Sequence, residues 1–306
     1  MPFARSSDAM PIARSKALPL PWLDRTGRLS LLKLAAFGLA VAPAVYLAAA
    51  YATHTLGPKP ITALIHGTGE WAIRFLLASL AVTPLRRVAN WPKLINVRRL
   101  LGVTTLAYAL AHLLLYVVDQ NFDLAKVASE IALRFYLTIG FVALVGLIAL
   151  GATSTDAAIR RLGPNWTRLH KAAYAIGILG LLHYFLQSKI DVSDPVFWTG
   201  LFVLLMGWRL MQRARLPMRP WSLALLAVVA GLATAGIEAA WYGIKSGIPA
   251  DLVLGANLDF SDVIRPAWWV FAVGLLLPVV ALVRGVPAAR KPAPRADRPH
   301  RIQPAA

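Results

Sequence analysis

Long apolar stretches separated by short polar segments dominate the chain. A membrane-spanning helix needs about 20 mainly apolar residues to cross the hydrocarbon core, and eight stretches are of this kind. They lie at residues 32–53, 63–83, 100–118, 134–151, 169–187, 196–212, 220–243 and 266–284. None alternates like the strand of a membrane barrel, and helices satisfy their own backbone hydrogen bonds in lipid. The pattern therefore predicts an all-α, polytopic transmembrane helix bundle.

The charge of the connecting segments alternates in sign along the chain. The N-terminus, residues 84–99, 152–168 and 209–219 and the tail after Arg284 are basic. The segments between them hold the acidic groups Asp119, Asp123, Glu130, Asp191, Asp194, Asp251, Asp259 and Asp262. Because basic segments stay in the cytoplasm, we expect a multi-pass protein of the bacterial inner membrane, surrounded by lipid, with both termini cytoplasmic. Topology alone then explains the net charge of +18, and we expect no nucleic-acid partner.

Composition agrees with a membrane protein and excludes all chemistry that depends on cysteine. Hydrophobic residues make up 58% of the 306 residues and charged residues only 15%, whereas soluble domains carry about a quarter. The chain has no cysteine, which excludes disulfides, iron–sulfur ligation and thiolate catalysis. A bound metal must rely on His, carboxylate, Met or Tyr side chains.

The stretches group into four parts. We expect a cytoplasmic N-terminal segment (1–31), a six-helix transmembrane core (32–215), an additional transmembrane hairpin (216–285) and a disordered, Pro- and Arg-rich basic tail (286–306). No cleavable signal precedes the first stretch, so we expect that stretch to remain as a membrane anchor.

Two histidines lie inside apolar stretches at similar depth. His112 and His183 each fall close to the non-cytoplasmic end of their predicted helix. Ionisable groups inside a span are costly and suggest function, and two neutral imidazoles on different helices are what a bis-histidine haem requires. The alternative is two unrelated histidines, each hydrogen-bonded within the bundle.

His170 opens the fifth stretch at the cytoplasmic edge. Its spacing from His183 places the two on different faces of an ideal helix, and Arg98 and Arg99 stand where a second histidine partner would be needed. A second haem is possible but lacks an obvious ligand. His170 could instead serve a quinone or flavin site, or simply cap the helix.

Other polar groups near the span ends are weaker candidates. His66, Glu70 and Arg74 follow one another at four-residue steps on one helix face. Arg74 could bind haem propionates and His66 could be a ligand, although a Glu70–Arg74 ion pair would need no cofactor. Arg134 and Tyr136 could also meet a propionate. The two remaining histidines, His54 and His300, are expected to be solvated.

Soluble nucleotide-binding motifs are missing. Neither a G-x-G-x-x-G turn after a strand nor a P-loop occurs. Any pyridine nucleotide would therefore have to act through another protein.

Several segments of the core resemble the MsrQ (formerly YedZ) family within the ferric-reductase-like transmembrane superfamily. They are LIHGTGEWAIRFLLASLAVTPLRR (64–87), RRLLGVTTLAYALAHLLLY (98–116), LTIG (137–140), TSTDAAIRRLGPNWTRLHKAAY (153–174) and HYFLQSKI (183–190). The resemblance covers roughly residues 30–215 and does not extend to the hairpin and tail.

The resemblance implies a haem-binding membrane subunit of a periplasmic methionine sulfoxide reductase system. Such subunits take electrons from the quinone pool or a cytoplasmic flavin reductase and pass them to a periplasmic molybdopterin subunit that repairs oxidised envelope proteins. The family is described as binding haem b and FMN. Its haem-associated histidines fall on His112, His170 and His183, and its early motif histidine on His66. No FMN ligand can be assigned to a residue.

The leading hypothesis is therefore an electron-transfer subunit without a complete active site of its own. One alternative is the membrane core of a ferric or superoxide-type reductase whose flavin–nucleotide part is a separate chain. The other is a transporter, which would show broken helices and internal repeats around a midplane site.

Overall fold

The computed structural model describes residues 20–284, apart from 25, 190 and 262. Every predicted apolar stretch contains one long helix: α1 (Leu31–Ala52), α2 (Pro60–Val88), α3 (Arg98–Asp119), α5 (Phe135–Ala152), α8 (Ala172–Gln187), α9 (Ser193–Arg213), α10 (Pro220–Ser246) and α12 (Pro266–Arg284). Within this described part the chain forms no strand beyond an isolated bridge between Leu23 and Leu29. The all-α membrane bundle predicted from the sequence is confirmed. His300 and the predicted disordered tail lie outside the described residues.

Within residues 20–284, as far as the structure describes them, six helices are long and apolar enough to cross a membrane: α1, α3 with its preceding turn, α5, α8 with α7, α10 and α12. The chain is therefore a multi-pass membrane protein. Helices α2 and α9 have 29 and 21 residues but carry more polar groups, among them Glu70, Arg74 and Arg209. That they also cross the bilayer stays a prediction.

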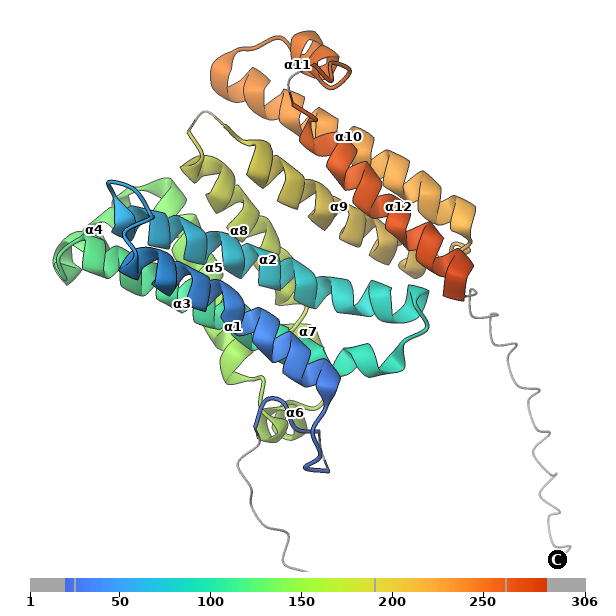
Figure 1. Cartoon of the computed structure of the whole chain (residues 1–306), viewed down its shortest axis with the longest axis horizontal. Helices are drawn as coiled ribbons and strands as arrows, with labels where there is room; N and C mark the ends of the chain where they lie inside the picture. The colour runs from blue at the N-terminus through green and yellow to red at the C-terminus, as the bar shows by residue number, and fades with distance from the viewer. Residues whose placement is uncertain (1–19, 25, 190, 262, 285–306) are drawn as a thin grey trace, which may run out of the picture.

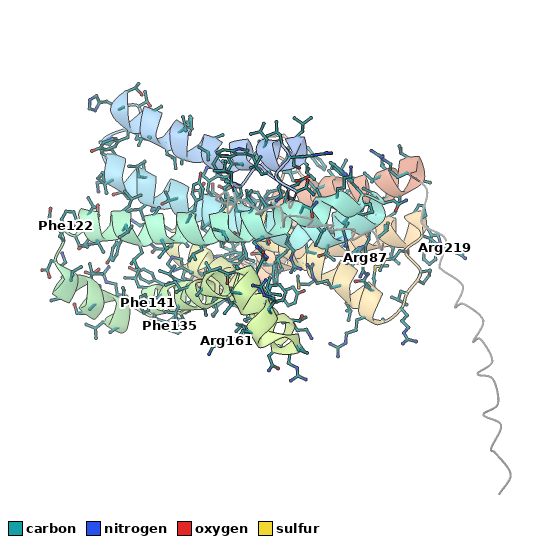
Figure 2. All side chains as sticks on the ribbon, turned by 90° about the horizontal axis from the view of Figure 1, so that it is seen from below. Arg87, Phe122, Phe135, Phe141, Arg161 and Arg219 are labelled. Carbon is teal, nitrogen blue, oxygen red and sulfur yellow. The ribbon has the colours of Figure 1, made fainter. Side chains whose placement is uncertain are left out.

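Successive long helices run in opposite directions (Figure 1). One end of the bundle holds α4 (Leu124–Leu133), the α8–α9 loop and α11 (Ala250–Ala256). The other holds the turn η1 (Pro92–Val97) and the short helices α6 (Asp156–Leu162) and α7 (Pro164–Leu169). Arg87 and Arg219 lie at this second end, and Phe122 at the first (Figure 2). The acidic and basic segments are thus separated between the two ends, here called the acidic end and the basic end.

Short helices fill segments that were predicted as loops. Helix α4 begins after Asp123, whose carboxylate accepts a hydrogen bond from the Lys126 backbone, and α6 begins after Thr155, whose hydroxyl accepts one from Ala158. Such side-chain caps satisfy backbone N–H groups that a helix start leaves free. Gly163 then separates α6 from α7 with a positive φ of 49°, and Pro164 opens α7.

The core consists of clusters that share helices. Leu76, Ala143, Leu147 and Ile176 join α2, α5 and α8. A second cluster joins α9 to α10 and α12 through Trp208, Leu223, Ala230, Val270 and Leu277. The hairpin of α10 and α12 therefore packs on α9, and α2, α3, α5 and α8 surround the two intramembrane histidines.

Candidate functional site

His112 on α3 and His183 on α8 are brought together near the acidic end of the bundle. Their ring centres are 6.1 Å apart and their ring planes are almost perpendicular, at 87°. Both side chains are only partly exposed. His112 lies seven residues before the end of α3 and His183 four residues before the end of α8. The two histidines singled out by their depth are therefore neighbours in space.

Each imidazole is held by a backbone carbonyl of the helix beside it. The Nδ1 atom of His112 lies 2.8 Å from the carbonyl oxygen of Ile65 on α2, and the Nδ1 atom of His183 lies 2.8 Å from that of Tyr136 on α5. A carbonyl oxygen can only accept, so Nδ1 carries the proton in both rings. In a neutral imidazole this leaves the Nε2 lone pair available in both.

This arrangement fits two axial ligands of one metal. Histidines that bind a metal nearly always donate their other ring N–H to a carbonyl, carboxylate or water. Metal–imidazole bonds are about 2 Å long and a ring nitrogen lies about 1 Å from its ring centre, so two rings on one metal have centres about 6 Å apart. The separation of His112 and His183 matches that value.

The two imidazoles indicate which kind of metal group could bind between them. Among the residues that the structure describes, no cluster of three or more His, Asp or Glu side chains could hold a free metal ion. Two imidazoles alone suit a metal that brings its remaining ligands with it, as the iron of a haem does. The residues present therefore fit a bis-histidine haem.

A polar cluster lies next to the histidine pair toward the acidic end. Tyr116, one turn beyond His112 on α3, donates a 2.6 Å hydrogen bond to Glu130 of α4. Glu130 also forms a 2.9 Å ion pair with Arg134, which donates to the Tyr136 hydroxyl at 3.1 Å. The hydrogen bond from Arg134 to Tyr136, together with Glu130, raises the pKa of Arg134 above its usual value, so this guanidinium stays charged. The cluster joins three helices and is connected to the His183 partner through Tyr136.

His170 lies apart from the pair, at the basic end. It follows the last residue of α7, where the helix is interrupted before α8 begins at Ala172, so the expected single helix over 169–187 is wrong in its first turn. Its Nε2 is 3.1 Å from the Thr153 hydroxyl, and its ring stacks on Trp166 with centres 4.0 Å apart. No second histidine faces it among the described residues.

The candidate residues on α2, His66 and Arg74, do not take part in the pair formed by His112 and His183. The His66 side chain is exposed. Arg74 forms a 2.8 Å ion pair with Glu70 and lies over the rings of Trp71 and Trp198. This ion pair is the cofactor-free alternative considered for these residues, and a role for His66 or Arg74 in binding a cofactor stays a prediction. His54 is exposed at the end of α1, as expected.

Sequence reasoning missed the partners of the two histidines. The carbonyls of Ile65 and Tyr136 carry no sequence signature of their own, and Tyr116 and Glu130 were not singled out. One signal was available: each histidine follows its carbonyl partner by the same interval of 47 residues, and a glycine follows each carbonyl by four.

The fold and the paired imidazoles define a helical membrane protein whose core holds two histidines with a geometry that suits a metal. The family described as "Ferric reductase like transmembrane component" matches residues 68–181, which include His112 and His170 and end just before His183. No solved structure matches the chain.

Curated relatives identify a narrower family. The "Protein-methionine-sulfoxide reductase heme-binding subunit MsrQ" of Azospira oryzae is 40% identical over 197 residues, which are 63% of this chain and 84% of that protein. The protein of the same description from Rhodospirillum rubrum is 39% identical over 63% of this chain and 91% of its own length. That from Xanthomonas campestris pv. campestris is 42% identical over 52% and 73%. The chain belongs to the MsrQ family.

Proposed function

We propose that the chain is a haem b membrane subunit that carries electrons for a protein-methionine-sulfoxide reductase system. The observation that supports this most is the histidine pair, in which both Nδ1–H groups are bound to backbone carbonyls and both Nε2 atoms are left for a metal. The printed descriptions of the relatives, which name a heme-binding subunit of such a system, point to the same function.

His112 and His183 would hold the haem iron from opposite sides. When bound, the haem exchanges single electrons between its ferric and ferrous states. The Ile65 and Tyr136 carbonyls fix the tautomer and plane of each ring. Arg134 and Tyr136 lie on the acidic side of the pair and could bind a propionate, whereas Arg74 is already paired with Glu70.

The position of the pair supports a transfer of electrons toward the periplasm. It lies near the acidic end of α3 and α8, which the charge alternation predicts to be periplasmic. Electrons would enter from quinol, or from a cytoplasmic flavin reductase, and would leave to a periplasmic molybdopterin reductase subunit. The chain would then lie in the inner membrane with both termini cytoplasmic.

A second haem and an FMN are further predictions of the family resemblance. His170 is the histidine that the family resemblance offers as a ligand for a second haem, and its Nε2 lies 3.1 Å from the Thr153 hydroxyl, in a hydrogen bond. For a haem to bind there, this hydrogen bond must break. No described residue is assigned to FMN.

Spectroscopy of the purified protein tests the proposal. We expect a b-type reduced-minus-oxidised spectrum, reduction by a quinol analogue, and reoxidation when a molybdopterin methionine sulfoxide reductase and methionine sulfoxide are added together. Omission of either the reductase or the sulfoxide is the control. A protein without a b-type signal contradicts the proposal, and reoxidation by ferric chelates alone favours the ferric-reductase alternative.

A further inference from the structure

The two histidines are held by the same structural arrangement on two pairs of helices. On α2 and α3 the parts are Ile65, Gly69 and His112; on α5 and α8 they are Tyr136, Gly140 and His183. In both, the glycine lies four residues after the carbonyl and the histidine 47 residues after it. Two helix pairs thus repeat one geometry around the site.

Both glycines are in direct contact with an imidazole. A Cβ atom placed on Gly69 would lie 2.9 Å from Nδ1 and 3.1 Å from Cε1 of His112. One placed on Gly140 would lie 2.8 Å from Nδ1 and 2.9 Å from Cε1 of His183. Carbon atoms do not approach so closely, so an alanine at either position would displace the ring.

Helix geometry explains why a glycine stands at this point. The carbonyl of residue i accepts the N–H of residue i+4, and the Cα–Cβ bond of a helical residue points back toward the preceding turn. The side chain at i+4 therefore covers the carbonyl at i. Without a Cβ, that oxygen stays open to a second donor, here the imidazole Nδ1–H.

We propose that Gly69 and Gly140 are positioning residues for the axial ligands: each exposes the carbonyl one turn before it, and that carbonyl fixes the plane and tautomer of one histidine. The inference rests on the proposed haem between His112 and His183. It adds two residues that touch neither iron nor substrate but determine the angle between the two ligand rings.

The angle between the rings provides a direct readout. Low-spin ferric haem with nearly perpendicular axial imidazoles gives a highly anisotropic EPR signal, and nearly parallel rings give a rhombic one. The angle of 87° predicts the highly anisotropic type for the unaltered protein. Gly69→Ala or Gly140→Ala should turn one ring away from its carbonyl and shift the spectrum toward the rhombic type.

Loss of the hydrogen bond between the imidazole and the carbonyl has a second consequence. A hydrogen bond from Nδ1–H makes the imidazole a stronger donor and favours ferric iron, so its loss should raise the haem midpoint potential. Removal of such outer partners typically lowers metal affinity about 10–100-fold. We expect a loss of haem retention in that range for each variant during detergent washing.

Two other glycines of α2 and α3, the helix pair that holds His112, serve as controls. A Cβ on Gly102 of α3 would meet only the Ser79 hydroxyl, at 3.8 Å, and one on Gly67 of α2 would meet the Leu47 side chain at 2.9 Å. Gly102→Ala adds a methyl group in ordinary van der Waals contact, and Gly67→Ala adds a clash with an aliphatic side chain. Both should keep the EPR spectrum and midpoint potential of the unaltered protein.

The outcomes separate this inference from the proposed function. Suppose that the full-length protein binds haem, but that Gly69→Ala and Gly140→Ala leave its EPR spectrum and midpoint potential unchanged. The positioning role is then wrong, while the haem site stands. If the unaltered protein binds no haem, the proposed function fails first. If neither variant can be purified, the EPR spectrum of the unaltered protein decides. A rhombic signal overturns the proposal, because the rings that the glycines are proposed to position are then not perpendicular. A highly anisotropic signal supports it.

Discussion

Charged side chains beside the histidine pair should set the potential of a haem held there. Glu130 and Arg134 carry opposite charges and form an ion pair next to Tyr136, whose carbonyl binds His183. A nearby carboxylate stabilises ferric haem, which carries one more positive charge than ferrous haem, and a guanidinium does the reverse. The partly exposed position of the pair means that salt weakens both effects.

We therefore predict midpoint shifts of opposite sign for the two members of the ion pair. Glu130→Gln should raise the haem midpoint potential and Arg134→Gln should lower it, both by less at high ionic strength. Tyr116→Phe removes the hydrogen bond to Glu130 but keeps both charges, and should change the potential least. Redox titration of the three variants measures this, and shifts of the same sign for Glu130 and Arg134 would refute it.

The residues of the site were only partly predictable from the sequence. His112 and His183 were found because an imidazole in an apolar helix is conspicuous and costly. Their hydrogen-bond acceptors are the backbone carbonyl oxygens of Ile65 and Tyr136. Every residue has such an oxygen, so the residue type does not reveal which one accepts. The helix break between Leu169 and Ala172 was not predicted. At this break the His170 ring stacks on Trp166 and its Nε2 lies 3.1 Å from the Thr153 hydroxyl.

At the scale of helices, close packing attaches the C-terminal hairpin to the core. A Cβ on Gly200 of α9 would clash with Thr234 of α10 and Val270 of α12, and one on Gly274 of α12 would lie 2.7 Å from the Ala227 Cβ. Small residues at helix interfaces let membrane helices approach closely, where packing replaces the hydrophobic effect as the driving force. The domain boundary predicted near residue 215 therefore falls between helices that share one core.

Gly200→Ala should loosen this attachment without disturbing the histidine pair. Added volume in a tight interface costs about 1–3 kcal/mol, and His112 and His183 belong to other helices. We expect a lower unfolding temperature of the detergent-solubilised protein with an unchanged haem spectrum. Gly236→Ala on α10, where a new Cβ meets no atom within 4 Å, is the control. Equal stability of both variants would contradict close packing here.

The helices themselves were the most predictable feature. In lipid the backbone can satisfy its hydrogen bonds only in helices or closed barrels, and the apolar stretches lack the alternation of barrel strands. The short helices α4, α6, α7 and α11 were missed because the apolar-length criterion does not detect segments of 6–10 residues. Helices α4 and α6 begin at the side-chain caps Asp123 and Thr155, which resemble ordinary loop residues in the sequence.

The whole molecule is polarised by charge from one end to the other. The segments at the basic end carry arginines such as Arg87 and Arg219 (Figure 2), and the acidic end carries Asp119, Asp123 and Asp259. The positive-inside rule predicts that the basic end faces the cytoplasm. The histidine pair would then lie close to the periplasm, where a partner can accept its electrons.

Single cysteines can test this orientation because the chain has none of its own. Ser129→Cys and Ser261→Cys at the acidic end should react with a membrane-impermeant maleimide in intact cells whose outer membrane has been permeabilised. Asn165→Cys at the basic end should react only after lysis. All three side chains are exposed, so differences in labelling report sidedness. Labelling of Asn165→Cys in intact cells would contradict the proposed orientation and would reverse the proposed direction of electron transfer.

The central claim, that one haem lies between His112 and His183, is tested most directly by haem-to-protein ratios of ligand variants. His112→Ala and His183→Ala, purified in parallel with His170→Ala, should each lose the low-spin b-type spectrum of this site, because each removes one of two axial ligands. His170→Ala should retain it, because His170 lies at the other end of the bundle, bonded to Thr153. A full haem complement and unchanged low-spin spectrum in both His112→Ala and His183→Ala would contradict the account.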